Sequence, residues 1–385
     1  MAKLKMYLLL LLTTTLLGCS STQTPVIAAN PHFLDLSFEG FEKYHIESEK
    51  EVFGLSEEAR RFVIRKLQSK HDPTVRMETL VREVFNRTDF NLIYDGTANT
   101  IASETFANKT ANCLSLSIMT YALAKEAGLG VVFQEIDIPE YWTRREGYSM
   151  LNGHVNLKLS QAKDPSRYYF DTRSMIVDFD PFSPKKHFPS VRAGRERILA
   201  MFYNNKGADA LISGEFRHAY AYFREALIVD KQFQSAWINL GILYRMTGHW
   251  DWAEKTYSSA LALNDNNLTV LENMAVLYDV QGLEKKAQKI MEKVHTKRRS
   301  NPYYHYIQGE QELENGEYEL ALAHYRKAIS LDKSKHEFYF GMAKTYAELG
   351  DVDKSQFYLK RAKRSANFDD QKSRYQSKLD LLTSL

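Results

Sequence analysis

Glycines recur every 34 residues in the second half of the chain, and this period limits the fold more than any other feature of the sequence. They are Gly214, Gly248, Gly282, Gly316 and Gly350. Ala219, Ala253, Ala287, Ala321 and Ser355 follow five positions later, and Ala226, Ala260, Val294, Ala328 and Ala362 follow seven positions after those. A fixed period of about 20 to 50 residues is the signature of a repeat array. Each unit is therefore expected to be one small helical or stranded element that buries its apolar face only against its neighbours.

Glycine and alanine at these positions fit a pair of short helices. Glycine permits the tight turn between them, and a small residue at the crossing lets the two backbones approach. The second unit carries Trp237, Leu240, Gly241, Tyr244, Ala253, Tyr257 and Ala260. This pattern resembles the tetratricopeptide repeat. The resemblance covers residues 200–369 and implies five repeats in an all-α solenoid.

Residues 370–385 are expected to form a helix that caps the last repeat, because Tyr375, Leu379 and Leu382 recur at helical spacing. Tetratricopeptide arrays bind a peptide or partner protein in a concave groove lined by the first helix of each unit. The resemblance places in this groove Asn204, Arg245, Glu272, Asp279, Tyr306, Glu310, Phe340 and Lys344. The alternative is that the array only spaces or dimerises the rest of the chain. The basic run Lys297-Arg298-Arg299 is interpreted as a solvated loop.

The first 18 residues are predicted to be a signal peptide, with two lysines followed by the apolar run from Tyr7 to Leu17. The run is too short for a comfortable membrane span of about 20 residues. Leu16-Leu17-Gly18-Cys19 resembles the lipobox of bacterial lipoproteins. That resemblance implies cleavage before Cys19 and acylation of its thiol, with residues 19–30 as a tether. Because Ser20 follows the cysteine, it also implies an outer-membrane location facing the periplasm.

Composition narrows the class of protein further. Removing 18 residues from 385 leaves 367, enough for two or three domains, and the 44% hydrophobic and 26% charged residues are typical of folded, water-soluble domains. The net charge of +3 falls to about +1 without Lys3 and Lys5, so nucleic acid is not an expected partner. Two cysteines, Cys19 and Cys113, cannot build a disulfide framework, and the histidines show no metal-ligand spacing. No metal or cofactor is expected.

Residues 31–195 have the pattern of an α+β domain with helices before strands. A first helix is predicted over 59–67, capped by Ser56. A second is predicted to begin at Pro73, and its apolar residues Met77, Leu80, Val81, Val84 and Phe85 share one face. A third is predicted from Asn112 or Cys113 to Gly128. Short β-branched or aromatic runs then predict strands over 131–138, 154–159 and 168–171.

Cys113 stands at the expected start of a helix, where backbone amides and the helix dipole stabilise a thiolate. His154 follows 41 residues later, at the start of a predicted strand, and Asp171 follows 17 residues after that, at the end of the next strand. A hairpin of these two strands would bring Asp171 beside His154. The alternative for each residue alone is a purely structural role.

The order of these residues resembles the transglutaminase-like (papain-like cysteine) superfamily. The resemblance covers about residues 85–175 and is carried by Asn112-Cys113-Leu114-Ser115, the helix running to Leu129, Gly153-His154 and Phe170-Asp171, although Val155 replaces the family's usual aromatic. It implies that Cys113 attacks a protein acyl group, His154 transfers the proton and Asp171 orients the imidazole. The Cys113 amide would hold the oxyanion.

The sequence therefore leaves two functions open. The first is a membrane-anchored cysteine acyltransferase, peptidase or amidase whose repeats recruit a protein substrate. The second is a non-catalytic envelope scaffold or assembly factor that binds partner proteins through the repeats, which differs from the first in making no use of Cys113.

Overall fold

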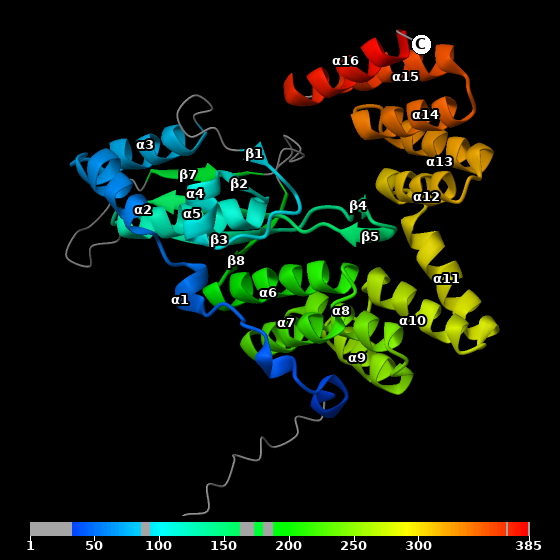
Figure 1. The fold of residues 1–385 in the computed structure, drawn as a ribbon, viewed down its shortest axis with the longest axis horizontal. Helices are drawn as coiled ribbons and strands as arrows, with labels where there is room; N and C mark the ends of the chain where they lie inside the picture. Colours follow the sequence, from blue (N-terminus) through cyan, green and yellow to red (C-terminus); the bar gives the residue numbers. More distant parts are fainter. Residues whose placement is uncertain (1–32, 86–92, 162–172, 180–187, 367–368, 384–385) are drawn as a thin grey trace, which may run out of the picture.

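The computed structural model describes residues 33–85, 93–161, 173–179, 188–366 and 369–383. Helices and a small sheet come first, and a long array of helices follows (Figure 1). In these described ranges no helix is both long and apolar enough to cross a membrane. Cys19 and the predicted signal peptide and tether lie outside them.

The N-terminal part begins with helices and two short strands. They are η1 (Asp35–Phe38), η2 (Phe41–Lys43), α1 (Glu49–Val52), α2 (Glu57–Phe62), the π-helix η3 (Val63–Gln68), α3 (Pro73–Phe85), β1 (Ile93–Tyr94), α4 (Ala102–Asn108), β2 (Thr110–Ala111) and α5 (Cys113–Glu126). Ser56 caps α2 as predicted, since its Oγ accepts a hydrogen bond from the Ala59 amide at 3.2 Å. The predicted face of α3 is wrong at its end, because Phe85 is 46% exposed and stacks on Phe179.

The strands form a four-stranded antiparallel sheet in the order β7-β6-β3-β8. Its members are β3 (Gly130–Ile136), β6 (Val155–Ser160), β7 (Ser174–Val177) and β8 (Ser190–Ala193). Helix α5 packs on this sheet, where Tyr121 stacks on Phe133 with ring centroids 4.5 Å apart. The expected strand over 168–171 lies outside the described residues, and β7 is the described strand beside β6.

A second hairpin leaves the sheet between β3 and β6. It consists of β4 (Trp142–Arg145) and β5 (Tyr148–Leu151), which pair only with each other. We call residues 139–151, which contain this hairpin, the arm. Figure 1 shows the arm extending from the sheet toward the helix array.

The second half of the chain is an all-α array, as predicted from the 34-residue period. Successive helices pair as hairpins: α6 (Arg195–Ile212) with α7 (Phe216–Val229), α8 (Gln234–Met246) with α9 (Trp250–Leu263), α10 (Leu268–Val280) with α11 (Glu284–Arg298), α12 (Pro302–Glu314) with α13 (Tyr318–Leu331), and α14 (His336–Glu348) with α15 (Val352–Ser365). Helix α16 (Asp369–Thr383) follows the last pair and buries Tyr375 and Leu379. The five periodic glycines take positive φ angles between 73° and 80°, which explains why glycine recurs there.

Close backbone approach explains a second set of glycines, those in the first helix of a hairpin. A Cβ on Gly241 would lie 2.3 Å from the buried ring of Tyr257, and one on Gly309 would lie 2.7 Å from the ring of Tyr325. An aromatic ring thus fills the space that a side chain on the facing helix would need.

We expect Gly241→Ala to destabilise the array. The added methyl group must displace the fully buried Tyr257 ring, at an overpacking cost of about 1 to 3 kcal/mol that exceeds the gain in helix propensity. The readout is the melting temperature by circular dichroism. Gly96→Ala is the control, because a Cβ there would meet no atom closer than 4.0 Å. Equal melting temperatures for the two variants would show that the close approach does not constrain the fold.

Candidate functional site

The topology brings the start of α5 and the start of β6 to the same end of the sheet. Helix α5 turns at Gly128 directly into β3, so the two elements run in opposite directions. Strand β6 is antiparallel to β3, and the Ile136 amide donates to the His154 carbonyl at 3.0 Å. Cys113, the first residue of α5, and His154, immediately before β6, therefore both belong to the end of the domain from which the arm emerges.

His154 is buried and contacts a carboxylate. Its side chain is 2% exposed, and Nε2 lies 2.9 Å from Oδ2 of Asp178, which follows β7 directly. Asp171, the predicted partner, lies outside the described residues. Sequence reasoning missed Asp178, although the signal was present: an acid directly follows the β-branched run Ile176-Val177.

The N-terminus of α5 has the environment that favours a thiolate. Asn112 is the N-cap, and its Oδ1 accepts from the Ser115 amide at 2.9 Å. Helix α5, all of which the structure describes, carries no acidic residue in its first turn. The half-buried Cys113 thus stands at a positive dipole end that no helical carboxylate offsets.

The arm is bound to the helix array through Arg298, the last residue of α11. Its guanidinium is 2% exposed and donates to both carboxylate oxygens of Glu140 at 2.8 and 2.9 Å. It also donates to Glu272 at 2.7 Å and stands 4.7 Å from the centroid of the Trp142 ring. The interpretation of 297–299 as a solvated loop was wrong, because Lys297 and Arg298 belong to the last turn of α11 and the ion pairs of the buried Arg298 come from residues distant in the sequence.

Further contacts continue along the arm to α12. Arg144 forms a bidentate ion pair with Glu314, with distances of 2.6 and 3.0 Å. Trp142 packs with Tyr304 and Ile307 in a small buried cluster. The arm therefore occupies the faces of α10 and α12, which are both first helices of their hairpins.

Three family models match the helix array. They are described as TPR repeat over residues 309–350 and as Tetratricopeptide repeat over 234–267 and 336–368. Residues 234–267 coincide with the hairpin of α8 and α9, and 336–368 with that of α14 and α15, whereas 309–350 runs from the end of α12 through α13 and α14. The chain contains tetratricopeptide repeats. Such repeats are a protein–protein interaction module.

Curated relatives and solved structures share this similarity. Two sequences named photosystem I assembly protein Ycf3, from Prochlorococcus marinus strains NATL1A and NATL2A, are 31% identical over 86 residues, which is 22% of this chain. The chain spans about half the length of these relatives. Among solved structures, a tetratricopeptide repeat protein from Parabacteroides merdae has 17% identity and a TM-score of 0.33, covering 48% of this chain and 71% of that one. Pseudomonas aeruginosa PilF has 17% identity and a TM-score of 0.28, covering 48% and 91%.

The structure gives several predicted groove residues partners within the chain. Glu272 pairs with Arg298, and the buried Glu310 accepts from the Tyr325 hydroxyl and from Lys344, each at 2.6 Å. Burial and the Glu310 carboxylate raise the pKa of the Tyr325 hydroxyl, so it remains a donor. Asn204 is buried and accepts from the Asn239 amide at 2.9 Å, whereas Asp279 is exposed. The remaining predicted groove residues are half-buried, and they are Arg245, Tyr306 and Phe340.

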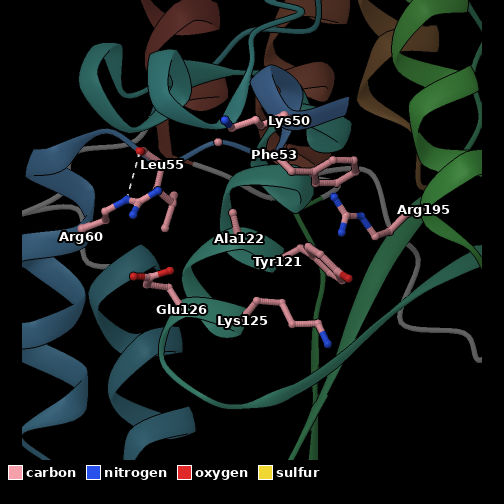
Figure 2. A pocket seen from close by; sticks show the side chains of 10 residues that line it. Lys50, Phe53, Leu55, Arg60, Tyr121, Ala122, Lys125, Glu126 and Arg195 are labelled. Atoms are coloured by element: carbon pink, nitrogen blue, oxygen red, sulfur yellow. Dashed lines mark hydrogen bonds between the residues drawn. The ribbon is translucent and has the colours of Figure 1, made fainter. Parts of the chain in front are cut away.

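A separate hollow of about 400 Å³ lies nearer the other end of α5. Figure 2 shows Lys125 and Arg195 beside the Tyr121 ring, with Lys50 near Phe53 and Arg60 next to Leu55 on other sides of the hollow. Tyr121 follows Cys113 by eight residues, which is about 12 Å along the helix, so this hollow is not part of the thiol site. Among the described residues no cluster of histidine, cysteine and acidic side chains could hold a metal ion.

We expect Arg298→Gln to destabilise the protein by about 3 kcal/mol, because it leaves the carboxylates of Glu140 and Glu272 together without their cation. The measurement is the free energy of unfolding from urea denaturation. Arg144→Gln is the matched control, since it removes an arm ion pair whose partner, Glu314, is 43% exposed, and should cost about 1 kcal/mol or less. Equal losses would contradict a special role for Arg298.

Proposed function

We propose that this chain is a scaffold or assembly factor that binds partner proteins through its tetratricopeptide repeats. The observation that carries the proposal is the regular array of helix hairpins, of which three segments match family models. The arm covers part of the faces of α10 and α12. Phe340 and Lys344 of α14 lie beyond the arm and keep part of their surface exposed, Lys344 while pairing with Glu310, so we choose them as the groove residues that meet a partner.

The similarity to an assembly protein supports this proposal. The relative named photosystem I assembly protein Ycf3 matches over 86 residues. We propose assembly of a protein complex as the kind of work the repeats do here, with no inference about the identity of that complex. We also propose that acylated Cys19 holds the chain at the bacterial outer membrane, on the periplasmic side, as the sequence at Leu16 to Ser20 predicts.

Affinity capture of the full-length chain after cross-linking in its native envelope tests the scaffold proposal. We expect a double variant, Phe340→Ala with Lys344→Ala, to recover at least about tenfold less of each specific partner, because interface anchors commonly contribute about 2 kcal/mol. The matched control is Phe357→Ala with Lys327→Ala, which makes the same changes at exposed residues of α15 and α13.

Cys113→Ala should recover the same partners as the unaltered chain if binding alone is the function. Equal recovery by the groove and control variants would overturn the assignment of the groove. Loss of partners in Cys113→Ala alone would overturn the scaffold proposal in favour of thiol chemistry.

A second function, thiol-dependent acyl transfer, is favoured by the contact of His154 with Asp178. With Nε2–H donated to Asp178, Nδ1 is the basic ring nitrogen. In this function Nδ1 takes the Cys113 proton, and Sγ forms a bond to the carbonyl carbon of an amide. The carbon–nitrogen bond breaks as His154 returns the proton to the leaving amine. Water or another amine then attacks the thioester, gives its proton to His154 and releases the thiolate.

Alkylation of Cys113 by iodoacetamide across pH tests this second function in the full chain carrying Cys19→Ser, where Cys113 is the only thiol. We expect half-maximal reactivity below pH 7, against an ordinary thiol pKa of about 8.5, and at least about tenfold slower reaction at pH 6 in His154→Ala and Asp178→Asn. Asp171→Asn is the control that distinguishes the two aspartates. If Cys113 is alkylated only above pH 8 in the chain that carries no change besides Cys19→Ser, this function is excluded.

A further inference from the structure

A chain of hydrogen bonds joins the start of α5 to the first helix of the repeat array. The Asn112 amide donates from Nδ2 to Oδ1 of Asn99 at 2.5 Å. Asn99 in turn donates from Nδ2 to Oδ2 of Asp209 in α6, also at 2.5 Å. Asp209 therefore contacts, through one intervening side chain, the residue that precedes Cys113.

The arm contacts Asp209, the last residue in this series of hydrogen bonds. Arg145 of β4 donates to Oδ1 of Asp209 at 2.5 Å, and both side chains are 27% exposed. Asp209 thus accepts from two donors, one on each carboxylate oxygen. Partial burial makes such charge-assisted hydrogen bonds stronger and more selective for geometry than those of a fully exposed pair.

Residues 98–100, which include Asn99, also form hydrogen bonds with the start of α5. The Asn112 amide N–H donates to the Ala98 carbonyl at 3.1 Å, and the Thr100 amide donates to the Ser115 hydroxyl at 2.9 Å. The buried Asn112 completes the arrangement by capping the Ser115 amide. Displacement of Asn99 would release Asn112, and the first turn of α5 would lose its cap.

We infer that Asp209 is a positioning residue for the Cys113 thiol, supplied by the repeat array to the N-terminal domain. It holds Asn99, Asn99 holds Asn112, and Asn112 keeps the first-turn amides of α5 directed at the position of Sγ. The inference rests on the second proposed function. Its consequence is that the thiol site is complete only when the arm and α6 are in place.

The sign of the effect separates positioning from direct electrostatics. Asp209 is an anion, so its removal acting through space would favour the thiolate and lower the thiol pKa. The unpaired Arg145 cation would act in the same direction. Loss of the helix cap does the opposite, because amides that fray away from Sγ stabilise the thiolate less, and the thiol pKa rises.

Other charged and titratable groups belong to this end of α5 and stay unchanged in the test. Asp95 keeps its charge across the range, because hydrogen bonds from Thr97 and then the charge of Arg145 lower its carboxyl pKa. Among the described residues, Glu104 of α4 and Lys109 directly after it carry further charges, and His154 and Asp178 flank strands of the sheet.

The test is the pH dependence of iodoacetamide alkylation in the full chain carrying Cys19→Ser, with Asp209→Asn compared against Glu314→Gln. An amide at 209 offers one acceptor where two donors need one each, so the contact with Asn99 or with Arg145 is lost. Glu314→Gln makes the same carboxylate-to-amide change at the neighbouring arm pair, Arg144–Glu314, which does not touch Asn99. Asn99→Ala is a second variant, which interrupts the series of hydrogen bonds from Asn112 to Asp209 without changing the charge.

We expect the alkylation midpoint to move up by about one pH unit in Asp209→Asn and in Asn99→Ala, and to stay in place in Glu314→Gln, with all variants folded by circular dichroism. An unmoved or lowered midpoint in Asn99→Ala, or in a folded Asp209→Asn, would overturn the positioning role. A midpoint above pH 8 in the chain without these changes would instead refute the second proposed function itself, so the two failures are distinguishable.

Discussion

The arrangement of the molecule depends on a buried cation, Arg298, between two carboxylates and an indole ring. Four of its five N–H donors are used, two on Glu140, one on Glu272 and one on the Thr269 hydroxyl. Burial opposes the charge, but the hydrogen bonds and charges of Glu140 and Glu272 outweigh this and raise the pKa of Arg298. A guanidinium in such a site keeps its proton and its planar geometry, so it holds the arm in one orientation.

Because the arm is bound in this way, the two halves of the chain constrain each other. Part of the repeat surface, on α10 and α12, is covered by the chain itself, and α14 lies beyond the arm. The same arm carries Arg145 to Asp209, so the repeats also reach the start of α5. The arm therefore links the surfaces of α10 and α12 to the start of α5.

The sequence predicted the helices and turns that depend on local residue patterns. The 34-residue period predicted the helix pairs and the tight turns at the periodic glycines, the spacing of Tyr375, Leu379 and Leu382 predicted the last helix, and Asn112 or Cys113 was predicted as the start of α5. The contacts of Arg298 were not predictable, because no local pattern records contacts between distant residues, and Arg298 was interpreted as solvated. Asp178, which contacts His154, was not singled out, although it directly follows the β-branched run Ile176-Val177. Predicted Asp171 and Cys19 lie outside the described residues.

The central claim is that the arm is held on the repeats as part of the folded core. Hydrogen–deuterium exchange of the backbone amides of residues 140–151 in the full chain tests it most directly. The account predicts protection that is lost only when the repeats unfold, with the same denaturant dependence as α10 and α12. Exchange within seconds, while those helices remain protected, would show that the arm is not bound and would contradict the account.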